Sequence, residues 1–325
     1  RRRSPVMTTP LFLPEAVASR VRRLGPDAVS WLDAVPQLAA SVAGRWGVEI
    51  GYPPDQPTDA VILRGRRGSQ PVVLKLWFDK GRCRAEQAVL AAAQGVGYVR
   101  LIEADPDLGV LLLEGLGGAL DADDVERTEG TDRLTGILGD TLTAAWRVSP
   151  SVWPLPESPH PAERLREAIV ANPAPFDVPD CRAAVDRALA YAEQRRDADD
   201  PDRRVLAHGN PHLGNFRSVN PTRAGAETGY VLIDPHPTLV EPEYDLGIVV
   251  RDGNRHLLHV EDAVVWTRNW CARLAERTGT DAEAVWQWGY LHRVALGLRL
   301  VNGPTPLSGR LYLQTATALI SRWRA

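Results

Sequence analysis

The sequence predicts an α+β protein in which a β-rich N-terminal lobe is followed by a mainly helical C-terminal lobe. Short apolar runs rich in Val, Leu and Ile, bounded by Gly and Pro, gather before residue 115. Longer stretches with apolar residues at helical spacing dominate after residue 120. Because 325 residues are enough for two compact units, we expect domains at 1–114 and 115–325.

The expected elements follow from periodicity and from turn residues. Amphipathic patterns predict helices in the N-terminal lobe near 14–24, 27–46 and 82–92. Apolar runs predict a hairpin within 48–63 and strands near 72–74, 99–104 and 109–113. In the C-terminal lobe, two short buried strands are expected at 204–207 and 230–233. The helices expected around them lie near 131–148, 161–172, 179–197, 260–278, 282–302 and 306–323.

Polar residues follow each of the two short strands of the C-terminal lobe. The first strand leads into the segment from His208 to Asn215, and the second ends at Asp234. Loops that leave strand ends are where rigid scaffolds place functional groups. Carboxylate and amide oxygens suit Mg²⁺, which takes one or two protein carboxylates together with phosphate oxygens and water. Asn215 and Asp234 therefore form a candidate magnesium pair.

This arrangement resembles the aminoglycoside phosphotransferases and the wider superfamily of protein-kinase-like small-molecule kinases. Their catalytic loop reads H-G-D-x-H-x-x-N, and here His208-Gly209-Asn210-Pro211-His212-Leu213-Gly214-Asn215 follows it with one exception. Ile233-Asp234-Pro235 and the segment from Glu241 to Leu246 are most similar to the streptomycin and hydroxyurea kinase branch. The resemblance implies a two-lobed protein-kinase-like fold and transfer of phosphate from ATP to a hydroxyl. It also implies that His208 is a structural member of the loop and that Asn215 and Asp234 bind Mg²⁺.

The exception is Asn210, which stands where the family has its catalytic aspartate. An amide has no oxygen that can hold a proton near neutral pH, so a rate loss on the order of 10² to 10⁴ is expected. We favour an Asp to Asn exchange made to inactivate the enzyme, because the two residues are nearly isosteric. A natural variant that uses another base, or a pseudokinase that only binds, is the alternative.

Lys75 is the candidate ligand of the nucleotide phosphates. Only Lys75 and Lys80 are lysine among 38 basic residues, and Lys75 ends an apolar strand. A compact ammonium there suits the α- and β-phosphates of ATP. Glu86, 11 residues later on the next predicted helix, is the expected carboxylate partner that orients it. Lys80 is interpreted as a solvated turn residue.

Two other nucleotide contacts are expected from the resemblance. The stretch around Glu114 and Leu116 matches the hinge between lobes, whose backbone would bind adenine. The segment 51–59 should cover the phosphates, but it holds three prolines and one glycine. Proline lacks the backbone donor that cradles phosphates, so this loop departs from a glycine-rich pattern.

The acceptor is expected to be a hydroxylated small molecule that an antibiotic resistance enzyme would modify, and a cationic aminoglycoside fits best. Carboxylates outnumber basic residues after residue 120, which favours a cationic acceptor. A nucleoside antibiotic or another hydroxylated metabolite is the alternative. The acidic candidates near the metal pair are Glu241, Glu243, Asp245 and Asp252, with Asp245 interpreted as the N-terminal cap of a helix that orients the loop. The aromatic candidates, most of them expected in the core, are Trp266, Trp270, Trp286, Trp288 and Tyr290.

Composition excludes several other classes. Three scattered cysteines without C-x-x-C pairs predict neither a disulfide framework nor a zinc site. The sequence has no apolar run of 18 residues and no signal-peptide pattern, so we expect a cytoplasmic protein without membrane contact. A net charge of -3 and the lack of a basic stripe argue against nucleic-acid binding. No pattern specifies an oligomeric state.

Overall fold

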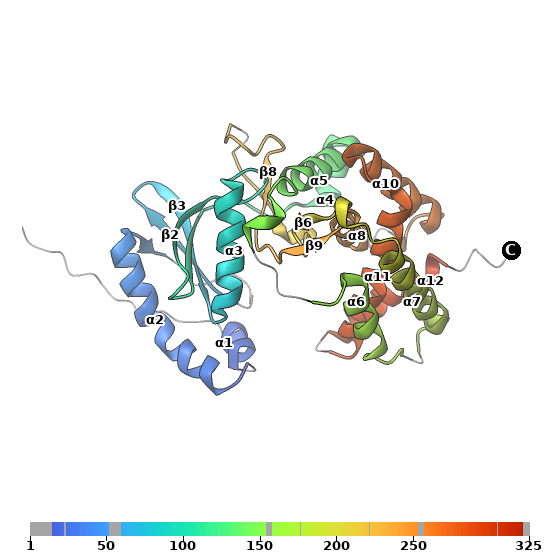
Figure 1. Ribbon diagram of the computed structural model, residues 1–325, viewed down its shortest axis with the longest axis horizontal. Coiled ribbons are helices and arrows are strands. Elements are labelled where there is room, and N and C mark those ends of the chain that lie inside the picture. Colours follow the sequence, from blue (N-terminus) through green and yellow to red (C-terminus); the bar gives the residue numbers. More distant parts are fainter. Residues whose placement is uncertain are drawn as a thin grey trace, which may run out of the picture. The chain divides into compact units, whose positions relative to one another are not determined.

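The computed structural model describes residues 15–22, 24–51, 60–153, 158–175, 177–220, 222–252, 257–303 and 305–320. The chain forms two compact units, one of residues 1–95 and 99–117 and the other of residues 96–98 and 118–325. The first unit holds the larger sheet and the second is mainly helical (Figure 1), so the predicted α+β class is confirmed. No helix among the described residues is long and apolar enough to cross a membrane.

The N-terminal unit is built on an antiparallel sheet. Among its described residues, five strands pair in the order β1-β2-β3-β5-β4. The strands β2 and β3 form a hairpin in which Arg67 faces Gln70, and Gly68 turns the chain at φ 60°. The hairpin predicted within 48–63 corresponds to β1 and β2, which pair antiparallel, and residues 52–59 between them lie outside the described residues. The strands are β1 (Glu49–Ile50), β2 (Ala60–Arg67), β3 (Gln70–Trp77), β4 (Leu101–Asp105) and β5 (Val110–Glu114).

Helices lie on both faces of this sheet. Helices α1 (Glu15–Arg22) and α2 (Pro26–Trp46) share a core cluster with Val72, Leu74 and Leu76 of β3. Because successive strand side chains point to opposite faces, Lys75 and Trp77 point to the other face, toward α3 (Lys80–Ala93). Asp79 caps α3 through the N–H groups of the first turn. Lys80 is therefore the first residue of a helix and not a turn residue, although it is exposed as expected.

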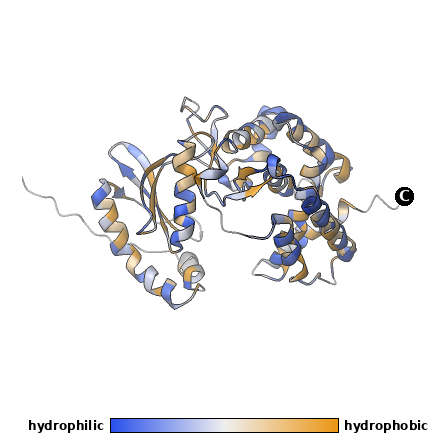
Figure 2. Ribbon diagram, in the orientation of Figure 1, coloured by the Kyte–Doolittle hydropathy of each residue, from blue (hydrophilic) through white to orange (hydrophobic). Residues whose placement is uncertain are grey.

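The C-terminal unit is a helical assembly around α11. The buried residues of α11 lie all round this helix, because α6, α7, α8, α10 and α12 contact it. The ribbons of the other helices alternate between hydrophobic and hydrophilic residues (Figure 2). The predicted helices are present, and α4, which the sequence did not predict, joins them. The bounds are α4 (Ala122–Glu129), α5 (Thr131–Ala145), α6 (Pro161–Val170), α7 (Cys181–Asp197), α8 (Glu243–Arg251), α10 (Ala263–Thr278), α11 (Ala282–Val301) and α12 (Pro306–Ala318).

Two short antiparallel ladders support the predicted catalytic segment. Strand β6 (Val205–Ala207) pairs with β9 (Thr238–Val240), and β7 (Phe216–Ser218) pairs with β8 (Tyr230–Leu232). The two strands predicted here, β6 and β8, are confirmed. Their partners β7 and β9 were not predicted, because Phe216-Arg217-Ser218 and Thr238-Leu239-Val240 include polar residues and form no continuous apolar run. The loop from His208 to Asn215 thus runs from one ladder to the other.

Close contact between α8 and α11 depends on Gly247. A Cβ atom at this position would lie 2.5 Å from Trp288 Cβ and 2.7 Å from the backbone nitrogen of Gly289. We expect Gly247→Ala to lower the free energy of unfolding by about 1–3 kcal/mol through overpacking, measured by urea denaturation. The control is Gly44→Ala in α2, where nothing lies within 4 Å of the added atom. That change should leave stability the same or raise it by up to ~1 kcal/mol; equal losses in both variants would contradict the packing argument.

Candidate active site

The predicted catalytic segment, residues 208–215, is fixed from within by His208, which is fully buried. Its Nδ1 accepts the backbone N–H of Asn210 at 3.2 Å, and its Nε2 lies 2.9 Å from the carbonyl oxygen of Ile233. These bonds assign the proton to Nε2, which donates to Ile233. Burial lowers the pKa of His208 to about 3, so the ring is neutral at physiological pH. The role of His208 is to join the two loops that follow β6 and β8.

Asp245 holds the same segment from the side of α8. Its carboxylate accepts the backbone N–H groups of His208 at 2.7 Å and of Gly209 at 2.9 Å, and the indole N–H of Trp146 at 2.9 Å. Burial raises the pKa of Asp245 to about 6, while these three donors act in the opposite direction by favouring the ionised form. Asp245 is the third residue of α8, after Pro242 at the N-cap position. The predicted N-terminal cap is therefore wrong, although the carboxylate does orient the loop.

Gly209 allows the two loops to approach each other. Its φ is +81°, and a Cβ atom there would lie 1.9 Å from the carbonyl oxygen of His236. The N–H of His236 donates in turn to the carbonyl oxygen of His208 at 2.7 Å. Only glycine fits this crossing, because both the backbone angle and the space exclude a side chain.

Hydrogen bonds also connect the two loops that carry the candidate metal ligands, Asn215 and Asp234. The side-chain N–H of Asn215 donates to the carbonyl oxygen of Asn210 at 2.9 Å, and the N–H of Ile233 donates to the carbonyl oxygen of Asn215 at 3.0 Å. Asp234 follows directly, in the left-handed conformation at φ 59°, which Asp and Asn adopt more readily than other side chains. Since the amide nitrogen of Asn215 is engaged, its oxygen is the atom that it can offer to a cation.

This donor set fits Mg²⁺ better than a transition metal. One amide oxygen and one carboxylate are hard ligands, and Mg²⁺ completes its shell with phosphate oxygens and water. No group of three or more His, Cys, Asp or Glu side chains among the described residues is arranged to hold a metal ion. An ion that arrives with a phosphate ligand needs only one or two protein ligands.

In the N-terminal unit, Lys75 and Glu86 form a buried ion pair. Lys75 Nζ lies 2.8 Å from Glu86 Oε1, and the two residues are 4% and 1% exposed. The second oxygen of Glu86 accepts the indole N–H of Trp77 at 2.8 Å. The structure thus brings the two predicted partners into contact and adds a third residue that the sequence analysis did not single out.

Glu114 and Leu116, the predicted adenine-binding residues, lie at the end of β5 and two residues beyond it. Glu114 is the last residue of this strand, and its N–H and its carboxylate both bond to the backbone of Arg100, at 3.1 and 2.7 Å. The N–H of Gly115 donates to the carbonyl oxygen of Pro71 at 2.9 Å. Leu116 comes next, just before the end of the N-terminal unit at Gly117.

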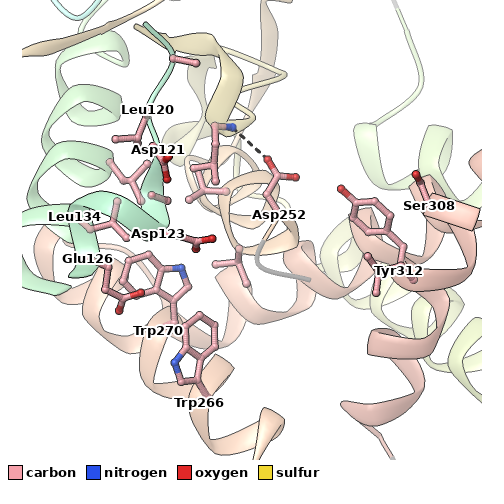
Figure 3. Close-up of a pocket in the computed structure, with 17 residues that line it drawn as sticks. Leu120, Asp121, Asp123, Glu126, Leu134, Asp252, Trp266, Trp270, Ser308 and Tyr312 are labelled. Carbon is pink, nitrogen blue, oxygen red and sulfur yellow. Dashed lines mark hydrogen bonds between the residues drawn. The ribbon is translucent and has the colours of Figure 1, made fainter. Parts of the chain in front are cut away.

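A cavity of about 670 Å³ adjoins the catalytic segment within the C-terminal unit. Leu213 of the segment lines it, and the Leu213 N–H donates to Asp252 at 3.2 Å. Figure 3 shows carboxylates from the α4 region and from the end of α8 around the cavity, with two indole rings of α10 on its wall. No Lys, Arg or His is among its lining residues in the described part of the chain. The lining carboxylates are those of Asp121, Asp123, Glu126 and Asp252.

The other predicted acidic candidates do not face this cavity. Glu241 and Glu243 are 3% and 0% exposed, and each pairs with an arginine. Glu241 Oε1 lies 3.3 Å from Arg195 Nη1 and accepts the indole N–H of Trp288, while Glu243 pairs with Arg203. These buried, paired carboxylates do not line the cavity, whereas Asp252 does line it and accepts the Nε–H of Arg251 at 3.0 Å.

The aromatic candidates divide in the same way. Trp266 and Trp270 line the cavity, with stacked rings whose centres are 6.1 Å apart. Trp286, Trp288 and Tyr290 are buried in α11, so the expectation that most of the set lies in the core is confirmed.

Sequence reasoning also missed Trp77, Trp146 and the carboxylates of α4. The signal for Trp77 was present, since it lies two residues after Lys75 in a strand and so shares its face. The acidic run Asp121-Ala122-Asp123-Asp124 was also visible as a helix start. No local pattern links Trp146 to Asp245, which is 99 residues away.

The sequence profile of the aminoglycoside/hydroxyurea antibiotic resistance kinases matches residues 47–302, which include both the ion pair and the catalytic segment. The chain belongs to that family. As a member of the family it is a small-molecule phosphotransferase, and the resemblance inferred from the two loops is confirmed.

Curated relatives of this kinase family support the assignment. The chain is 28% identical over 297 residues to a streptomycin 6-kinase from Streptomyces glaucescens, covering 87% of this chain and 90% of the relative. It is 26% identical over 244 residues to a hydroxyurea phosphotransferase from Kitasatospora aureofaciens, covering 71% of this chain and 65% of the relative.

Solved structures show the same fold. Choline kinase LicA from Streptococcus pneumoniae superimposes with a TM-score of 0.57 at 12% identity, covering 87% of this kinase and 98% of that chain. An aminoglycoside phosphotransferase solved with ADP and hygromycin B gives a TM-score of 0.56 at 14% identity, covering 86% and 97%. The predicted kinase-like fold is confirmed.

The buried imidazole predicts a specific pH dependence of stability. The unfolded chain binds a proton at His208 as the pH falls below 6.5, but the folded kinase does so only near pH 3. Folding stability from this group is therefore complete above pH 6.5 and falls by about 1.4 kcal/mol per pH unit between 6.5 and 3. His208→Gln keeps a donor and an acceptor without titrating, so its unfolding free energy should depend less on pH over this window.

Urea unfolding at several pH values between 7 and 4.5 measures this difference. The control is His259→Gln, since His259 is exposed. Asp245, whose raised pKa acts with the opposite sign between pH 3.8 and about 6, is present in all three proteins and does not affect the comparison. Parallel curves for wild type and His208→Gln would show that His208 is not a buried neutral group.

Proposed function

We propose that this kinase transfers the γ-phosphoryl group of Mg·ATP to a hydroxyl of a cationic small molecule of the aminoglycoside type. The observation that carries the proposal is the carboxylate-lined cavity beside the catalytic segment. Four carboxylates and no basic side chain line it in the described part of the chain. Such a cavity favours ammonium or guanidinium groups and offers little to a neutral acceptor such as hydroxyurea.

Aromatic residues add to this preference. The stacked rings of Trp266 and Trp270 stand beside the carboxylates in Figure 3. Indole faces attract cations, most strongly where water is excluded. A ring system that carries both hydroxyl and cationic groups would gain from each part of the wall. The relatives named for streptomycin agree with such an acceptor.

The nucleotide roles follow the family pattern residue by residue. Lys75 would bind the α- and β-phosphates while Glu86 orients it, and the backbone at Glu114 and Leu116 would bind adenine. Asn215 and Asp234 would hold Mg²⁺, which supplies charge neutralisation on the phosphates. The neighbouring structures solved with AMP and ADP support a nucleotide in this fold.

Asn210 limits the rate in this proposal. Its backbone N–H and carbonyl fix the segment, but its carboxamide cannot take the proton of the attacking hydroxyl. Binding of Mg·ATP and acceptor should remain, because neither depends on a base. A binding protein without chemistry is the second candidate, and Asn210 is the observation that favours it.

The first experiment compares the protein that carries Asn210 with Asn210→Asp, using ATP and a panel of a streptomycin-class aminoglycoside, hydroxyurea and a nucleoside antibiotic. We expect Asn210→Asp to add one phosphoryl group to the cationic acceptor at a rate on the order of 10² to 10⁴ times that of the Asn210 protein. Product mass and ATP consumption measure this. Lack of product from both proteins, with Mg²⁺-dependent ATP binding retained in calorimetry, would favour the binding protein instead.

The acceptor cavity is tested separately, in the Asn210→Asp background. Asp123→Asn and Glu126→Gln should each raise KM for the cationic acceptor by about three- to tenfold, because each removes a partly solvated attraction. The KM for ATP should not change. Glu129→Gln, in the same helix but outside the cavity, is the matched control. An equal effect of all three substitutions would argue against recognition by the cavity carboxylates.

A further inference from the structure

Trp77 completes the environment of the buried ion pair in the N-terminal unit. Its indole N–H donates to Glu86 Oε2 at 2.8 Å, while Glu86 Oε1 accepts from Lys75 at 2.8 Å. The two oxygens of one carboxylate are thus held by two different donors. Lys75 Nζ also lies 4.5 Å from the centre of the Trp77 ring. Trp77 therefore contacts both members of the pair, one through its N–H and the other through its ring.

The strand geometry makes this contact specific. Lys75 and Trp77 are separated by one residue in β3, so both side chains point to the face where α3 lies. Trp77 is 2% exposed, and Arg82 of α3 lies with its guanidinium carbon 4.9 Å from the ring centre. A charged group of the strand and one of the helix thus both lie against the ring.

Burial explains why a third residue is needed. An ion pair removed from water loses the hydration of both charges, and the pair is stable only where further hydrogen bonds satisfy the remaining lone pairs. An indole N–H is an uncharged donor, so it satisfies an oxygen of Glu86 without replacing the charge of Lys75. It can hold Glu86 in place while Lys75 forms additional bonds elsewhere.

We propose that Trp77 is a positioning residue for Lys75, acting through the second oxygen of Glu86. The proposal rests on the proposed phosphate-binding role of Lys75. When the ammonium turns toward a phosphate oxygen, the Trp77 N–H keeps the carboxylate fixed and hydrogen-bonded. Without that N–H, Glu86 adopts other rotamers and Lys75 loses its fixed direction.

The test uses Trp77→Phe, which retains an aromatic ring over Lys75 and removes the N–H. Lys75 and Lys80 are the two lysines of the chain, so acylation by an amine-reactive ester can be assigned by peptide mass spectrometry, with exposed Lys80 as the internal reference. Trp46→Phe is the matched control, because Trp46 lies in the same unit at the end of α2. The labelling and the binding measurements use the whole 325-residue chain.

We expect the ratio of Lys75 to Lys80 labelling to rise about tenfold in Trp77→Phe, as expected for loss of a hydrogen bond to a charged group. The dissociation constant for Mg·ATP, measured by calorimetry, should rise by a similar factor. Trp46→Phe should change neither. If both variants, or neither, show these changes, the proposal is overturned.

A double-mutant cycle separates positioning from general support of the fold. In a Glu86→Gln background, Trp77→Phe should add little to the change in Lys75 labelling, because Trp77 acts through that carboxylate. Independent, additive effects would overturn the proposal. If Trp77→Phe lowers the urea midpoint strongly, β-(3-benzothienyl)alanine at position 77 replaces the N–H by sulfur with the ring shape kept, and the same outcomes apply.

Failure of the proposed function has a different signature. In the protein that retains Trp77, Mg·ATP should slow acylation of Lys75 without affecting acylation of Lys80. If it does not, the phosphate-binding role of Lys75 is wrong whatever Trp77 does. If it does, and Trp77→Phe still behaves like wild type, only the role of Trp77 fails.

Discussion

The bonds from Asp245 to two consecutive backbone N–H groups are the constraint on which the catalytic segment depends. A carboxylate that accepts from His208 and Gly209 fixes the direction in which the chain leaves β6. It comes from α8, whose residues are buried from Glu243 to Arg251. The position of the loop is therefore set by the packing of the helical core. His208 in turn donates to the carbonyl oxygen of Ile233, which holds the second loop against the first.

Three buried carboxylates in this kinase share one kind of partner. Asp245 accepts the indole N–H of Trp146, Glu86 that of Trp77, and Glu241 that of Trp288, at 2.9, 2.8 and 2.7 Å. Tryptophan supplies a donor together with a large apolar surface, so it satisfies an acid while filling the space around it. The chain contains ten tryptophans. At least three of them donate an indole N–H to a buried carboxylate.

The sequence predicted the fold and the two loops because both depend on local signals. Periodicity identified the long helices, and the resemblance of residues 208–215 and of Asp234 to known kinase motifs pointed to the family. The missed features depend on contacts between distant residues. Asp245 was expected to cap its own helix but bonds to a loop 37 residues away along the chain. Glu241 and Glu243 were expected near the metal site, but they are buried and paired with Arg195 and Arg203. Charge in a sequence does not reveal whether a carboxylate faces water or is paired with an arginine.

The bonding of the catalytic segment has a consequence for how chemistry can change in this fold. Asn210 contributes its N–H and carbonyl oxygen to the segment, and no hydrogen bond of its carboxamide to another described residue is found. The geometry of the loop is thus independent of which side chain stands at 210, as long as it is of similar size. The groups that hold the loop in place and the side chain at position 210 are thus different parts of the same eight residues. If position 210 has the proposed role, a single exchange there changes the proton acceptor with no need for compensating changes in the surrounding helices.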